Sequence, residues 1–92
     1  MRWEWDPAKN RSNLAKHGLD FEDAEQALAG NCLTVEDCRS DYGEDRLVAV
    51  GLLKGRAIVI AYALRGEATR IISMRKANRR EQEIYQKRFG KS

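Results

Sequence analysis

The 92-residue sequence predicts an α+β fold: two N-terminal helices, an antiparallel β-sheet of three to five strands and a C-terminal helix. Two observations predict it. Apolar residues recur at helical spacing toward both ends of the chain, and β-branched, strand-like runs occupy the middle. Apolar residues make up 42% of the chain, enough for one core, so we expect a single domain over residues 1–92.

The first helix is marked by a start signal and a stop signal. Asp6 can cap the free amides, and Pro7 is favoured at the first helical position. We expect this helix to run from about Pro7 to Lys16, with His17 in or near its last turn and Gly18 as its stop.

A second helix is expected after Asp20, a residue type that caps helices well. Its apolar stripe consists of Phe21, Ala24 and Leu28. Gly30 ends this stripe, so we expect a short helix with one apolar face.

Four strand-like runs follow, separated by a polar loop at residues 37–45 and two turns, Lys54-Gly55 and 65–68. The runs are Cys32–Glu36, Arg46–Leu53, Arg56–Leu64 and Thr69–Lys76, and Trp3–Trp5 can add an edge. Regular alternation in the last run puts Arg70, Ile72, Met74 and Lys76 on one side and Thr69, Ile71, Ser73 and Arg75 on the other. Neither side is purely apolar, so we expect this strand to carry polar side chains with a function at one end.

The closing helix begins at Asn78, which pairs with Glu81 in a capping-box pattern. Its expected packing face consists of Ile84, Tyr85 and Phe89, and Gly90 ends it.

The net charge of +3 hides a strong segregation along the chain. Residues 18–45 carry nine acidic and one basic side chain, whereas residues 69–92 carry eight basic and two acidic ones. The fold can therefore present a positive face to phosphates and a negative face elsewhere, or the charges can mix on an ordinary solvated surface.

Other classes of protein are disfavoured by the sequence. The longest apolar-rich run, Ala57–Leu64, is far shorter than a membrane span, and no targeting signal is present, so we expect a cytoplasmic protein without membrane contact. Cys32 and Cys38 are expected as free thiols rather than as a disulfide. We expect no metal site and no cofactor, because the single His17 is distant and no Cys-x-x-Cys occurs.

Several segments resemble the BrnT family in order and spacing, over nearly the whole chain. They are Trp3-Glu4-Trp5-Asp6-Pro7-Ala8-Lys9-Asn10, residues 13–24, Gly43-Glu44-Asp45-Arg46, and residues 70–77 followed by Glu81 and Tyr85. The most distinctive are Lys16-His17-Gly18 and Arg70-Ile71-Ile72-Ser73. Met74 departs from the family, which usually has a small residue there. It either refills a gap in the core or narrows the active cleft.

The resemblance implies a RelE-like fold and a metal-independent endoribonuclease that inhibits translation. It also implies a cognate, BrnA-like antitoxin that holds the enzyme inactive and binds operator DNA together with it. Two other functions stay open: a nucleic-acid-binding module without catalysis, and an inactive scaffold subunit of the repressor complex.

RNA cleavage without metal uses the 2′-hydroxyl as nucleophile and needs a cation to stabilise the charge on the phosphate. Arginine suits this task, and the candidates are Arg65, Arg70 and Arg75. Arg70 and Arg75 face opposite sides of a regular strand, so only a bend or bulge can bring them together. We favour Arg75 with Arg65 as the catalytic pair; each arginine can instead be a surface residue in a salt bridge.

His17, the only imidazole, is the natural acid–base candidate, and Lys16 beside it is the substitute. His17 can also be a C-terminal residue that merely favours the helix dipole.

The candidates for RNA binding include two aromatic residues, Trp5 and Tyr85, which can stack on bases, although Tyr85 also sits at core spacing. The basic candidates are Arg70, Arg79 and Arg80, and the last helix can alternatively meet an acidic antitoxin segment. The acidic stretch Asp20–Glu25 is either a solvated helix face or a docking surface for a basic part of the antitoxin.

Overall fold

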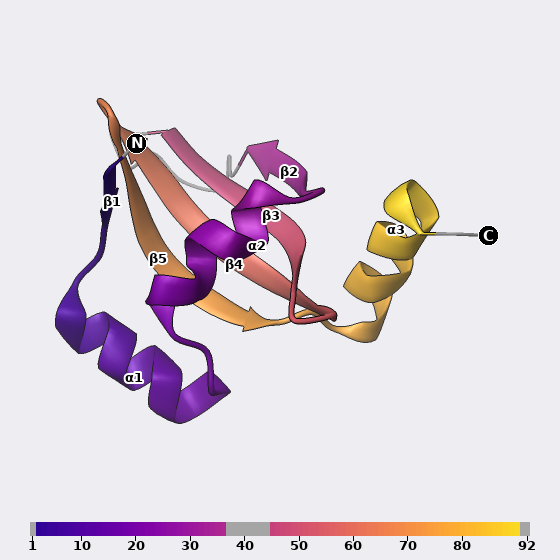
Figure 1. The fold of residues 1–92 in the computed structure, drawn as a ribbon, viewed down its shortest axis with the longest axis horizontal. Coiled ribbons are helices and arrows are strands. Elements are labelled where there is room, and N and C mark those ends of the chain that lie inside the picture. The colour runs from indigo at the N-terminus through magenta and orange to yellow at the C-terminus, as the bar shows by residue number, and fades with distance from the viewer. Residues whose placement is uncertain (1, 37–44, 91–92) are drawn as a thin grey trace.

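The computed structural model describes residues 2–36 and 45–90 (Figure 1). Along the chain it contains β1 (Arg2–Glu4), α1 (Pro7–His17), a 3-10 turn η1 (Phe21–Asp23), α2 (Ala24–Ala29), β2 (Leu33–Glu36), β3 (Asp45–Leu53), β4 (Arg56–Arg65), β5 (Ala68–Lys76) and α3 (Arg79–Phe89). The α+β class is confirmed, but a strand precedes the first helix. Most of the expected polar loop, with Cys38, lies outside the described residues.

The five strands form one sheet in the order β1-β5-β4-β3-β2. Strands β2 to β5 pair antiparallel, as expected, whereas β1 pairs parallel to β5, so the sheet is mixed. The expectation of a purely antiparallel sheet was wrong, because β1 reaches the edge through the long connection formed by the rest of the chain. No tight turn fixes its direction relative to β5.

The local signals around α1 are confirmed. The Asp6 carboxylate accepts a hydrogen bond from the Ala8 amide at 2.9 Å. At the other end, Gly18 has φ +70°, a left-handed conformation that favours glycine, and its amide donates to the Leu14 carbonyl. The Asp20 carboxylate accepts from the Glu22 amide, but the cap begins the 3-10 turn η1, and α2 follows as six residues.

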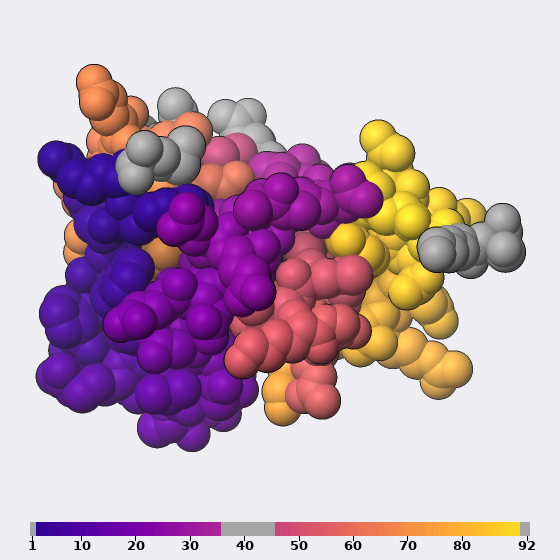
Figure 2. Space-filling view, viewed as in Figure 1, coloured from indigo at the N-terminus to yellow at the C-terminus, as the bar shows by residue number. Residues whose placement is uncertain are grey.

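One face of the sheet is covered by η1 and α2, and we call it the helix face (Figures 1 and 2). Its core joins residues of these two elements to residues of β3, β4 and β5. The buried members are Phe21, Ala24, Ala27, Leu53, Ile58, Ile60, Ile71 and Met74. Figure 2 shows the N-terminal helices as a continuous layer over much of this face, with α3, in yellow, against its right-hand side.

Strand β5 contains a bulge that changes which side chains share a face. Ala61 pairs with Ser73 and Tyr62 with Ile71, so Ile72 is an extra residue without a partner on β4. The expected alternation was therefore wrong: Ile71 and Met74 both point into the helix-face core, at 1% and 0% exposure. Met74 therefore lies in the core, which agrees with the explanation that it refills a gap there rather than narrowing an active cleft.

Helix α1 is fixed to β5 through Asn13, which is buried. The Asn13 Oδ1 accepts from the Met74 amide at 3.2 Å, and its Nδ2 donates to the Leu19 carbonyl at 3.1 Å. β1 pairs only with the first part of β5. Further along β5, the Asn13 side chain satisfies a backbone amide that a neighbouring strand would otherwise bind.

Helix α3 follows β5 directly and carries the expected capping box between Asn78 and Glu81. Tyr85 is buried, and its hydroxyl donates to the Asn31 carbonyl at 2.9 Å. The expected packing face was wrong for Ile84, which is 45% exposed, because α3 packs against the sheet along a narrow strip only. In the described part of the chain, no helix has the length and apolarity needed to cross a membrane.

Candidate active site

The face of the sheet opposite the helix face carries arginine side chains from β3, β4 and β5, and we call it the arginine face. Residues that pair directly across neighbouring strands point to the same side of the sheet. One such row runs from Arg46 through Ala63 and Arg70 to Glu4. The small Ala63, fully buried, leaves room for the long side chains on either side of it.

Glu4 organises one end of this face. Its Oε2 accepts a hydrogen bond from Arg70 Nη1 at 3.2 Å and lies 3.7 Å from Arg65 Nη1. Its Oε1 lies 4.0 Å from Arg2 Nη2. The Glu4 and Arg70 side chains are about one-third exposed, at 31% and 33%, so this carboxylate and its arginines are open to a ligand.

Arg75 lies at the other end of the face and forms a two-pronged ion pair with Glu81. Nη1 and Nη2 of the guanidinium each donate to one carboxylate oxygen at 2.8 Å. The hydrogen bond from Arg75 holds the pKa of Glu81 below its ordinary value, and the same bond raises the pKa of Arg75. This pair fixes the guanidinium beside the first turn of α3 while 43% of the Arg75 side chain stays exposed.

The arginines do not group as the sequence suggested. The bulge in β5 puts Arg70 and Arg75 on the same face of the sheet, whereas a regular strand would put them on opposite faces. Arg65, however, pairs with Ala68 and Arg75 with Val59, six residues apart along β4, or about 20 Å. Arg65 therefore shares Glu4 with Arg70 and cannot hold the same phosphate as Arg75.

The two acid–base candidates lie away from this cluster in the chain, at the C-terminal end of α1. Lys16 is exposed and His17 half-buried. Within residues 2–36 and 45–90, neither forms a hydrogen bond or ion pair with any of the three candidate arginines.

The aromatic and helical RNA-binding candidates divide into buried and exposed groups. Trp5 packs against the core, edge-on to Phe21 with ring centroids 6.3 Å apart, and Tyr85 is buried. Packing is therefore the better supported role for both rings. Arg79 and Arg80 are exposed on α3, where Arg79 Nε lies 3.6 Å from a Glu83 oxygen.

Sequence reasoning missed Glu4 and Arg46 as members of the site. Both residues stand within the segments that carry the family resemblance, which was the available signal. Their proximity to Arg70 depends on pairings between strands that lie far apart in the sequence, so local patterns could not reveal it.

A mixed five-stranded sheet with helices on one face and carboxylate-held arginines on the other defines a small α+β protein with an arginine-rich surface. The chain belongs to the BrnT family: the family model described as "Ribonuclease toxin, BrnT, of type II toxin-antitoxin system" matches residues 5–81. It is thus a ribonuclease toxin of a type II system, whose partner is an antitoxin. The search of curated proteins gave no match.

Proposed function

We propose that this toxin is a metal-independent endoribonuclease that cuts RNA through the 2′-hydroxyl and thereby inhibits translation. In this proposal it is a single domain of RelE-like fold that acts in the cytoplasm. A cognate, BrnA-like antitoxin neutralises it, and operator DNA is bound only through the complex. Membership of the BrnT family supports the toxin and ribonuclease assignment.

The observation that carries the catalytic proposal is the placement of Arg65, Arg70 and Arg75 on one solvent-accessible face. A guanidinium fork can donate two hydrogen bonds to a phosphate and so stabilise the extra negative charge of the transition state. In our proposal Arg65 and Arg70 hold the scissile phosphate, and Arg75 holds another phosphate further along the same strand. The spacing between Arg70 and Arg75, four residues along β4 or about 13 Å, suits separate phosphates of an extended strand.

Glu4 is the proposed general base, since its carboxylate lies among the arginines that would hold the phosphate. A bound phosphate would draw Arg70 away from Glu4 and leave a carboxylate oxygen to accept the 2′-hydroxyl proton. The 2′-oxygen then bonds to phosphorus, the bond from phosphorus to the 5′-oxygen breaks, and the departing 5′-oxygen takes a proton from water. His17 and Lys16 are the alternative acid–base residues. The two assignments predict opposite outcomes for Glu4→Gln and His17→Gln.

The test is cleavage of an end-labelled single-stranded RNA by the purified toxin in excess EDTA. We expect products with 2′,3′-cyclic phosphate ends, no cleavage of a substrate with 2′-deoxyribose at the cleaved nucleotide, and inhibition by the antitoxin. Activity that vanishes in EDTA and returns with Mg²⁺, or cleavage of the 2′-deoxy substrate, would contradict the mechanism.

The same assay identifies the base. Glu4→Gln should lower the cleavage rate about 100-fold, the usual contribution of a general base, and His17→Gln should stay within about threefold of the wild type. Glu67→Gln, at an exposed residue of the β4–β5 turn, is the matched control. The reverse pattern would assign the proton transfer to His17.

A further inference from the structure

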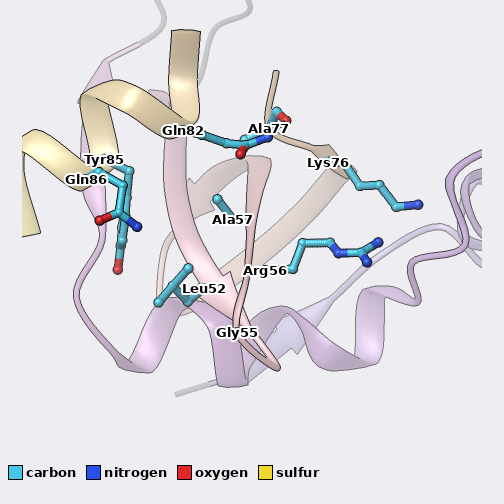
Figure 3. Close-up of a pocket in the computed structure, with 9 residues that line it drawn as sticks. All are labelled: Leu52, Gly55, Arg56, Ala57, Lys76, Ala77, Gln82, Tyr85 and Gln86. Atoms are coloured by element: carbon cyan, nitrogen blue, oxygen red, sulfur yellow. Dashed lines mark hydrogen bonds between the residues drawn. The ribbon is translucent and has the colours of Figure 1, made fainter. Parts of the chain in front are cut away.

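A pocket lies where the end of the sheet meets α3 (Figure 3). Its volume is about 420 Å³, within the range of small-molecule sites. Leu52 and Ala57 lie between its two sides. Leu52 is 41% exposed, so its side chain offers an apolar contact surface to a ligand in the pocket.

The two sides of the pocket offer different chemistry. Figure 3 shows Tyr85 and Gln86 of α3 on one side and Arg56 and Lys76 on the other. The Gln86 amide forms no side-chain hydrogen bond within the described part of the chain, so its donor and acceptor are both available. Arg56 and Lys76 supply two positive charges.

The pocket is continuous with the arginine face. Val59 pairs with Arg75, and Ala57, two residues before Val59, points to the same side of the sheet. Arg56 and Lys76 pair with Leu53 and Ile58 and therefore point to the helix face, so the pocket spans the end of the sheet from one face to the other. Gln86 is on the helix to which Glu81 anchors Arg75. An RNA strand laid along Arg65, Arg70 and Arg75 therefore reaches the Leu52 and Ala57 side of this pocket, and it meets Arg56 and Lys76 only where it passes the end of the sheet.

We propose that this pocket binds a nucleobase of the RNA substrate and gives cleavage its base preference, an inference that rests on the proposed ribonuclease function. The base contacts Leu52 and Ala57, the Gln86 amide bonds to its edge, and Arg56 and Lys76 hold the adjoining phosphate. A second pocket, around Trp3 and Tyr62, has Glu25 and no cation among its lining residues, which disfavours RNA there.

The test measures binding of three hexanucleotides, A6, C6 and U6, with 2′-O-methyl groups so that they cannot be cleaved. We expect the wild type to prefer one base about 10-fold over the weakest, a common contribution of hydrogen bonds to a base edge. Gln86→Met keeps the side-chain length but removes the amide, and should reduce the preference below threefold. Gln26→Met, at an exposed glutamine of α2, is the matched control and should leave it unchanged.

Arg56→Gln should lower the affinity for all three oligonucleotides by a similar factor. It should also reduce the salt dependence of binding, because a contact to a phosphate is lost. Wild-type affinities in both the Gln86 and Arg56 variants would overturn the pocket assignment. So would variants that bind RNA normally but lose affinity for the antitoxin, since the pocket would then be a protein-binding surface. If either contrary result is found and the wild type still cleaves RNA, only the pocket assignment fails. If the wild type does not cleave RNA, the proposed function itself fails.

Discussion

The two faces of the same sheet are built for different purposes. On the helix face, Phe21, Ile58, Ile60 and Ile71 are at most 1% exposed and pack against one another. On the arginine face, charged side chains are held in place by two carboxylates, Glu4 and Glu81, and stay partly open to solvent. Folding stability therefore comes mainly from the helix face, because burial of apolar side chains contributes more than partly exposed ion pairs do.

The largest expected loss of stability is on the helix face. Phe21→Ala should lower the free energy of unfolding by about 4 kcal/mol, because a fully buried ring is replaced by a cavity and the contact with Trp5 is lost. Denaturant unfolding measures the change. Leu14→Ala, at a leucine that is 46% exposed, is the control and should change stability by less than about 1 kcal/mol. Equal losses in both variants would contradict the division between the faces.

An intermediate effect is expected at Asn13, which joins α1 to the sheet. Asn13→Ala should cost about 3 kcal/mol, since the Met74 amide and the Leu19 carbonyl both lose a buried partner. Amide hydrogen exchange gives a second readout, because the Met74 amide should lose its protection. Unchanged protection there would mean that α1 is not held to β5 through Asn13.

The smallest effect is expected on the arginine face. Glu81→Gln removes the ion pair with Arg75, and the partly exposed location limits the cost to about 1 kcal/mol at pH 7. Because the folded-state pKa of Glu81 lies below its ordinary value, this stability is fully present above that value and is lost as pH falls through the folded pKa. Thermal unfolding should therefore show variant and wild type converging in acid; a constant difference would exclude the ion pair as the cause.

The features that the sequence predicted well are local ones. The caps at Asp6 and Asn78 and the stop at Gly18 involve residues within a few positions of each other, so their chemistry is visible in the sequence itself.

The features that it did not predict depend on distant partners. The bulge at Ile72 is defined by the pairing of β5 with β4, and it reverses the side to which the following residues point. Glu4 and Arg70 are 66 residues apart and meet only because β1 joins the edge of the sheet in parallel. The three arginines could therefore be named from the sequence, but their grouping could not.

In our proposal the arginine face performs the RNA chemistry, and Arg70 lies at the centre of that face. The measurement compares the RNA cleavage rate of Arg70→Ala with that of Arg11→Ala, which removes an exposed arginine from α1. We expect Arg70→Ala to cleave RNA about 100-fold more slowly, because one hydrogen-bond donor to the developing negative charge is lost. Its free energy of unfolding should stay within about 1 kcal/mol of the wild-type value. Arg11→Ala should cleave at the wild-type rate. A folded Arg70→Ala variant that cleaves as fast as the wild type would contradict the claim.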